Sequence, residues 1–230
     1  GEEGLEVWDL SALPEVTPIG SSSTPTYDIV INGELLAISA ETELILANAE
    51  TLEVLSTISI PSVGHSLATT ISSMWVEGAM IFVAANALTD GLLMIVDATD
   101  PSDPEVVYSQ ALEHIDEPSA LAASGEILFV AQGWGGYERL SLYDVSNPSD
   151  PVEIGRYMDE ELRLVRSIIP YRNHLFVASR TLMVFDISNP ENPQPVGEWE
   201  GLALSLAVDG SLLYTVNSAR PNDGLNVLEV

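Results

Sequence analysis

The chain has 230 residues, of which 46% are hydrophobic, so it can bury a sizeable core, and the absence of cysteine excludes disulfides, thiolate metal sites and a cysteine nucleophile. Asp and Glu together number 35 against seven basic residues, all of them Arg after residue 138, and the formal net charge is −28. This balance argues against nucleic acid and against anionic membrane surfaces as partners, because phosphate binding needs clustered basic charge. It suits solubility in a salty or extracellular setting, or alternatively an acidic face that collects divalent or basic partners. No apolar run reaches the roughly 18 residues of a membrane-spanning segment.

The first expected elements are two strands, at residues 5–10 and 16–20, that look like the second half of a larger unit. After them, short apolar runs recur in pairs, and most pairs are joined by a residue followed by glycine, as tight hairpin turns require. These pairs are Asn32-Gly33, Glu77-Gly78, Ser124-Gly125 and Asp209-Gly210. In the remaining copy Arg172-Asn173 occupies the turn, with Asn as the next best residue there.

The third copy shows the pattern of one complete unit. Its strands are expected at residues 120–123, 127–131, 139–145 and 152–157. The last two strands flank a turn with two prolines, which cannot donate to a strand ladder and therefore end the third strand cleanly. Asp144 and Ser146 can bond nearby backbone N–H groups and lock this corner.

The motif Asp-x-Ser/Thr-Asp/Asn-Pro-x-Asp/Asn-Pro occurs three times, starting at Asp97, Asp144 and Asp186, and weaker copies place Asn48 and Glu229 at the Asp position. These five marker residues lie 49, 47, 42 and 43 residues apart. Four-stranded antiparallel units of this length, without a helical pattern between them, are typical of propeller blades. The sequence therefore predicts an all-β protein, a β-propeller of about five four-stranded antiparallel blades or part of a larger ring, as a single domain over residues 1–230.

The pattern Leu-x-Ile-Val-Asp-x-Ser-Asn-Pro resembles the LVIVD repeat family. The match is close at residues 92–104, 140–151 and 182–193 and degenerate at 5–20 and 43–58. The resemblance implies a propeller and a secreted or surface setting in bacteria or archaea. It brings no catalytic residues, because the roles of the family are largely undefined.

Ring closure has two solutions in the sequence. The last three strands are expected at residues 203–208, 212–217 and 225–230, and the first two expected strands could complete that final blade. One third strand would then be surplus. Either the ring has five blades with a displaced end, or the chain is part of a longer protein with a larger ring.

Ligands of propellers usually bind where the loops that enter the first strands meet the loops between second and third strands. This rule places eight candidate ligand-binding residues near one rim: His65, His114, Asp116, Trp134, Tyr137, Arg166, Arg220 and Asp223. Trp134 and Tyr137 could stack on a sugar ring or a partner side chain, although Trp134 could instead plug the channel. The histidines and acids lack the local spacing of metal ligands, so no metal or other cofactor is expected. The regular Asp-Pro corners could suggest calcium, but their placement favours a role in stabilising turns.

No Gly-x-Ser-x-Gly elbow occurs, and no catalytic constellation stands out. We therefore expect a non-enzymatic extracellular or cell-surface propeller that mediates protein–protein or structural contacts. The alternative is a carbohydrate-active hydrolase or lyase that uses channel carboxylates, because carboxylate pairs are plentiful. A third interpretation is a building unit of a surface layer or filament.

Overall fold

A computed structural model describes residues 5–9, 17–22, 26–63, 69–87, 90–112, 118–133, 138–200, 203–217 and 224–230. Six antiparallel sheets make up this part of the chain, and in each of them the strands pair in chain order. The first sheet, here called the half-blade, joins β1 (Leu5–Asp9) and β2 (Thr17–Ser22). The last sheet, here called the terminal sheet, has three strands: β19 (Ser205–Asp209), β20 (Leu212–Asn217) and β21 (Gly224–Glu229).

Between these two sheets lie four complete four-stranded blades. Blade 1 consists of β3 (Asp28–Asn32), β4 (Leu35–Ala40), β5 (Glu43–Asn48) and β6 (Val54–Ser59). Blade 2 consists of β7 (Thr70–Glu77), β8 (Met80–Asn86), β9 (Gly91–Asp97) and β10 (Glu105–Leu112). Blade 3 consists of β11 (Pro118–Ser124), β12 (Ile127–Gln132), β13 (Arg139–Asp144) and β14 (Val152–Met158). Blade 4 consists of β15 (Ser167–Tyr171), β16 (His174–Ala178), β17 (Leu182–Asp186) and β18 (Gln194–Trp199).

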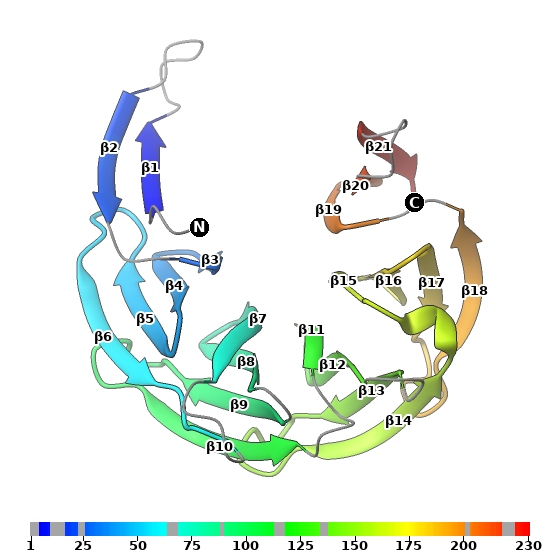
Figure 1. Cartoon of the computed structure of the whole chain (residues 1–230), viewed down its shortest axis with the longest axis horizontal. Helices are drawn as coiled ribbons and strands as arrows, with labels where there is room; N and C mark the ends of the chain where they lie inside the picture. The colour runs from blue at the N-terminus through cyan, green and yellow to red at the C-terminus, as the bar shows by residue number, and fades with distance from the viewer. Residues whose placement is uncertain are drawn as a thin grey trace.

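The sheets follow one another around an open arc (Figure 1). The first strands of the blades, β3, β7, β11 and β15, and β19 of the terminal sheet point to the middle, and the fourth strands form the outer edge. The half-blade and the terminal sheet stand at the two ends of the arc, with the opening between them. The predicted all-β propeller of four-stranded antiparallel blades is confirmed, and the strands of the third copy lie within two residues of their expected bounds.

The half-blade is in phase with the other sheets. In each complete blade the register between the third and fourth strands shifts at the same point. This point lies between the two residues that directly precede the marker residue. The pairing of β1 with β2 shifts between Val7 and Trp8, which is the same point relative to Asp9. The half-blade therefore supplies a third and a fourth strand, as the sequence predicted. A short 3₁₀ helix, Glu160–Leu162, was not predicted; it starts at Asp159, whose side chain accepts a hydrogen bond from the Glu161 backbone N–H.

The hairpin turns between first and second strands correct one prediction. In four copies a glycine stands first in the two-residue loop and has a positive φ, for example 61° at Gly78. In blade 4 Tyr171 pairs with His174, so the first loop residue is Arg172, and its φ is 54°. The prediction that Asn173 takes the role of glycine was wrong, because glycine stands first in the loop and Asn173 stands second.

The corners with two prolines are locked as predicted. The backbone N–H of Ser146 donates to Asp144 Oδ1 over 2.8 Å, and Thr99 and Ser188 donate to Asp97 and Asp186 over the same distance. Hydrogen bonds from the same serine and threonine residues lower the pKa of all three aspartates below its ordinary value of 3.8. Each marker aspartate therefore stabilises its own turn in the ionised state.

The core lies between sheets. We call the face that a sheet turns to the next sheet along the chain its trailing face, and the opposite face its leading face. Between blades 3 and 4, Phe129 and Leu142 of the trailing face pack in one cluster with Ile168, Val177 and Phe185 of the leading face. Equivalent clusters join blade 2 to blade 3 and blade 4 to the terminal sheet.

Two tryptophans pack between sheets. Trp75 and Trp199 are partly buried against these clusters between sheets. The side chain of Trp8 lies outside the described residues.

The proline corners also join neighbouring blades at their outer edges. Ser56 of β6 donates a hydrogen bond of 2.7 Å from its Oγ to the Pro101 carbonyl of the next blade. Gly155 of β14 holds the equivalent position in blade 3, where the Pro190 carbonyl of blade 4 lies directly over its Cα. In blades 1 and 3 a small residue on the fourth strand thus admits the next corner, whereas Tyr108 holds the equivalent position in blade 2.

Candidate functional site

The first strands of all four blades and of the terminal sheet line a central cavity of about 440 Å³, which we call the channel. Most of the groups facing it are polar or small. Its polar side chains, apart from the Tyr27 phenol and the Trp75 indole, are those of Asp28, Ser72, Ser73, Arg166, Ser167 and Ser205. The channel therefore carries one carboxylate and one guanidinium among the described residues that line it.

One position of the repeat organises the channel wall. It lies five residues before the first loop residue of each hairpin and holds Asp28, Ser73, Ala120, Ser167 and Ser205 in successive sheets. Asp28 Oδ2 accepts a hydrogen bond of 3.1 Å from the Met74 backbone N–H of the next blade. Ser73 Oγ accepts the equivalent bond, also of 3.1 Å, from Leu121 N–H. In blades 1 and 2 the side chain at this position therefore bonds one inner strand to the next.

Asp28 is the one acid at this position. Burial raises the pKa of its carboxyl above 3.8, and the hydrogen bonds from the Met74 and Ile29 backbone N–H groups oppose part of that rise. The bond from Ile29 N–H reaches Oδ1 over 2.9 Å, so each carboxylate oxygen accepts one backbone donor. The charge is thus partly desolvated and held in place.

Replacing Asp28 with Ser, the residue of three equivalent positions, tests this description. A carboxyl with a raised pKa in the folded state binds more protons than it does in the unfolded chain, so its contribution to the free energy of unfolding falls as the pH rises from 3.8 through the folded-state pKa. We expect D28S to flatten this part of the pH–stability profile and to unfold at neutral pH no more easily than the wild type, since a serine hydroxyl can still accept from Met74. D28A, which leaves that N–H without its acceptor, should lose about 1–2 kcal/mol. Urea unfolding between pH 4 and 8 measures both, and equal profiles for D28S and the wild type would contradict the assignment.

Arg166 is the predicted site residue that falls within the described part of the chain. It is exposed, directly precedes β15 and lines the channel, and its backbone N–H donates to the Ala178 carbonyl over 2.9 Å. The other seven lie outside the described residues: His65, His114, Asp116, Trp134, Tyr137, Arg220 and Asp223. Their convergence on one rim stays a prediction.

An ion pair lies in the segments that flank two of the predicted rim loops. Arg163 Nε, in the loop that enters blade 4, is 3.4 Å from Glu138 Oε1, just before the third strand of blade 3. The Glu138 side chain is only 7% exposed, and its Oε2 has no hydrogen-bond partner among the described residues. The sequence offered no signal for this pair. The polar channel position, by contrast, could have been found by aligning the copies on their turns.

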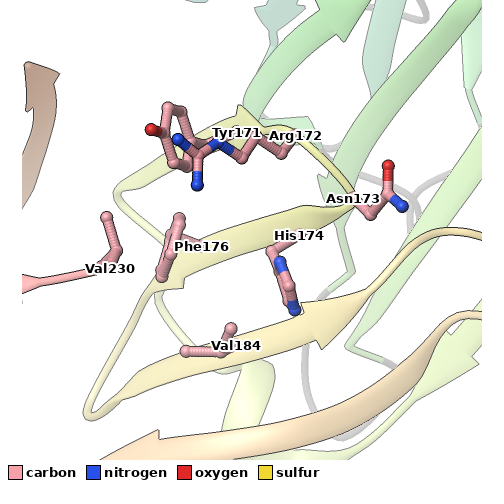
Figure 2. A pocket seen from close by; sticks show the side chains of 7 residues that line it. All are labelled: Tyr171, Arg172, Asn173, His174, Phe176, Val184 and Val230. Carbon is pink, nitrogen blue, oxygen red and sulfur yellow. The ribbon is translucent and has the colours of Figure 1, made fainter. Parts of the chain in front are cut away.

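A second cavity, of about 510 Å³, lies beside the hairpin turn between β15 and β16 (Figure 2). This turn is at the opposite end of β15 from Arg166. The cavity is largely apolar. Phe176 and Val184 form its wall with Val230, and the Arg172 guanidinium lies 4.8 Å from the centre of the Tyr171 ring. His174 lies at the start of β16 and faces this cavity.

Among the described residues, no group of three or more His, Asp or Glu side chains is placed to hold a metal ion. No helix in the same part of the chain is long and apolar enough to cross a membrane.

Comparisons with known proteins agree with this architecture. Two solved structures share the fold at low sequence identity. The computationally designed Ika4 protein is 12% identical with a TM-score of 0.52, over 74% of this chain and 94% of the designed one. BamB from Moraxella catarrhalis is 11% identical with a TM-score of 0.65, over 91% of this chain and 59% of BamB. This chain thus spans about three fifths of the BamB chain. No curated protein matches the sequence.

The family model described as the LVIVD repeat matches residues 70–110, 118–159 and 163–201, which correspond to blades 2, 3 and 4. These matches cover more than half of the chain. Together with the in-phase register of the remaining sheets, they show that the chain belongs to the LVIVD repeat family.

Proposed function

We propose that this chain is a non-enzymatic extracellular or cell-surface β-propeller that mediates protein–protein or structural contacts, and that it binds its partner at the channel rim that carries Arg166. The observation that carries the proposal is the channel itself. On its wall the Asp28 and Ser73 side chains, which hold the same position of the repeat, each accept a hydrogen bond from a backbone N–H of the next blade. Such a wall makes a rigid ring that presents loops, and loops on a rigid scaffold are where propellers and other β-folds recognise partners.

The state of Asp28 supports binding over hydrolysis. Glycoside hydrolysis needs two carboxyl groups on either side of the scissile bond. Asp28 is the single acid among the described residues that line the channel, and both of its oxygens accept backbone hydrogen bonds. It is thus engaged in joining two blades.

Composition supports the extracellular setting. The chain carries a net charge of −28. High net charge keeps a protein soluble and monodisperse at the ionic strengths found outside cells. The setting that the LVIVD resemblance implies agrees with this.

A library of random 12-residue peptides displayed on phage tests the binding site. We expect peptides selected on the wild-type chain to lose at least tenfold in affinity for R166A, because a guanidinium at the rim of the channel supplies charged hydrogen bonds. The matched control is R172A, which removes an arginine from the hairpin turns on the opposite side of the propeller. Equal affinity for R166A and the wild type, or equal losses in R166A and R172A, would overturn the channel rim as the binding surface.

Two more experiments test the remaining parts of the proposal. A panel of polysaccharides should give no turnover, whereas turnover that disappears in D28N would establish the hydrolase or lyase instead. Antibodies against the chain should label intact cells that express its gene. Labelling only after the cells are opened would refute the surface location.

A further inference from the structure

The loop that enters blade 4, residues 159–166 and here called the entry loop, holds a leucine in an unfavourable backbone conformation. Leu164 has a φ of 61°, in the left-handed region that a Cβ makes unfavourable, and it is 59% exposed. Residues strained in this way persist only where their surroundings impose the conformation, and they cluster at sites that bind ligands or partners.

Buried residues on both sides of this leucine fix the entry loop. Leu162 and Val165 are 3% and 2% exposed and belong to the apolar cluster between blades 3 and 4. Arg163 and Leu164 lie between them and are exposed. Anchoring on both sides therefore holds Leu164 in its left-handed conformation and keeps its side chain at the surface.

Hydrogen bonds join the entry loop to the loop between β16 and β17. Ser179 Oγ donates to the Glu161 carbonyl over 3.0 Å, and Ser179 is only 1% exposed. The Arg166 backbone N–H donates to the Ala178 carbonyl over 2.9 Å. The two loops thus form one surface, here called the blade 4 rim, which consists of residues 159–166 and 179–181.

A second leucine with a positive φ shows what Leu164 lacks. Leu52, whose φ is 59°, packs partly buried against the cluster of Leu36, Ile38 and Ala47. Burial of its side chain there offsets the unfavourable backbone. Leu164 belongs to none of the apolar clusters that the described residues form. A partner that covered its side chain would supply the burial that Leu52 finds within the chain.

Three arginines share the blade 4 rim with this leucine. Arg163, Arg166 and Arg180 are exposed, and they are three of the seven basic residues in a chain with a net charge of −28. Arg163 lies 3.4 Å from Glu138, whereas Arg166 and Arg180 have no ion-pair partner among the described residues. The rim is therefore a local concentration of cations on an acidic protein.

The acids of the entry loop lie on its outer part. Glu160 and Glu161 belong to the 3₁₀ helix, which Figure 1 shows toward the outer edge of the arc, and Asp159 caps that helix. From there the chain runs inward to β15, and Arg166 at the start of this strand lines the channel. The inner part of the rim thus combines an exposed apolar side chain with guanidinium groups.

We propose that the blade 4 rim binds an acidic peptide segment of another protein, with a large apolar side chain of the segment packed on Leu164 and its carboxylates paired with Arg166 and Arg180. This inference rests on the proposed function and names the chemistry of its partner. Guanidinium groups bind carboxylates through two parallel hydrogen bonds, which are stronger than neutral ones. The charge of the chain argues against a second copy, because two chains of −28 repel each other, whereas a short segment carries only a few charges.

Peptides selected from the 12-residue library on the wild-type chain test the chemistry. We expect them to carry more than one Asp or Glu next to a large apolar residue. L164A should lower their affinity about tenfold and R180A about threefold, because apolar anchors at the centre of a contact carry more binding energy than charges at its edge. Raising NaCl from about 0.05 M to about 0.5 M should weaken binding to the wild type more than binding to R180A. Fluorescence polarisation of labelled peptides measures each affinity.

The variant L164G separates binding from folding. Glycine adopts a positive φ without strain, so L164G should unfold at the same urea concentration as the wild type or at a higher one, and yet bind the selected peptides about tenfold more weakly. The matched control L52G loses a side chain that packs on a cluster, so it should unfold at a lower urea concentration and bind like the wild type. Equal destabilisation by L164G and L52G would make Leu164 a structural residue and overturn the proposal.

Other outcomes identify which part of the argument fails. Selected peptides without acids, or equal affinity for L164A and the wild type, would overturn the proposal, as would an equal loss in V152A, which truncates an exposed valine at the far end of β14 from the rim. If R166A still loses affinity in such a case, the channel rim remains the binding surface and only the chemistry of the partner is wrong. A library that yields no binding peptide would overturn both proposals. Self-association of the wild type that L164A abolishes in sedimentation velocity would assign the rim to a second copy instead.

Discussion

Adding one methyl group at Gly155 should destabilise the propeller by about 3 kcal/mol, among the largest effects expected of a single small substitution. A Cβ on Gly155 would lie 2.0 Å from the Pro190 carbonyl oxygen and 3.1 Å from its carbonyl carbon. Both atoms are backbone in a proline corner, so neither can rotate away. Relief requires blades 3 and 4 to separate at their outer edges, and this separation exposes part of the cluster between them. Urea unfolding of G155A followed by circular dichroism measures the loss as a lower midpoint.

The matched control is Gly197, which holds the equivalent position in blade 4. A Cβ there would meet only the Val184 side chain, at 3.6 Å, which is ordinary van der Waals contact. G197A should leave the free energy of unfolding unchanged or raise it by about 0.5 kcal/mol, since alanine loses less conformational entropy than glycine. Equal effects of the two substitutions would show that the corner does not hold the blades together.

Truncating Phe185 should cost about 4 kcal/mol. Its ring is fully buried at the centre of the cluster between blades 3 and 4 and meets the Tyr157 ring edge-on, with centroids 5.0 Å apart at an interplanar angle of 71°. F185A removes both the buried surface and the aromatic contact, and the strands around it cannot collapse without moving the sheets.

The conservative variant F185L separates these two contributions. Leucine fills most of the volume but forfeits the aromatic pair, so a loss of about 1–2 kcal/mol is expected. Chemical denaturation of both variants provides the comparison. A loss below about 1 kcal/mol for F185A would mean that blades 3 and 4 do not share the cluster described above.

The fold could be predicted because most copies of the repeat carry the same residue types at their turns. Glycine at the hairpin loops and proline at the corners restrict the backbone locally, so their spacing shows where strands end. The half-blade was predicted for the same reason: Asp9 carries the marker pattern even though its corner differs from the others. The prediction for Asn173 was wrong because the two-residue loop of blade 4 begins with Arg172, which takes the positive φ that glycine takes in the other copies.

The site was less accessible to prediction because its residues join different blades. The hydrogen bond from Met74 N–H to Asp28 joins residues 46 positions apart, so no local spacing in the sequence indicates it. Aligning the copies on their turns would have placed Asp28 among serines, and this contrast is the signal that was available. The ion pair between Arg163 and Glu138 joins segments with no repeated pattern, so only coordinates reveal it. Of the predicted rim residues, Arg166 lines the channel, and the others lie outside the described residues.

Strand pairing in strict chain order has a consequence for synthesis of the protein. Each sheet closes only short loops, so a blade can assemble as soon as its own segment leaves the ribosome, without waiting for distant residues. Until the next blade arrives, however, the newest sheet presents a bare apolar surface to the solvent. Slow translation within a repeat would prolong that exposure and favour aggregation, so the growing chain is most vulnerable midway through each blade.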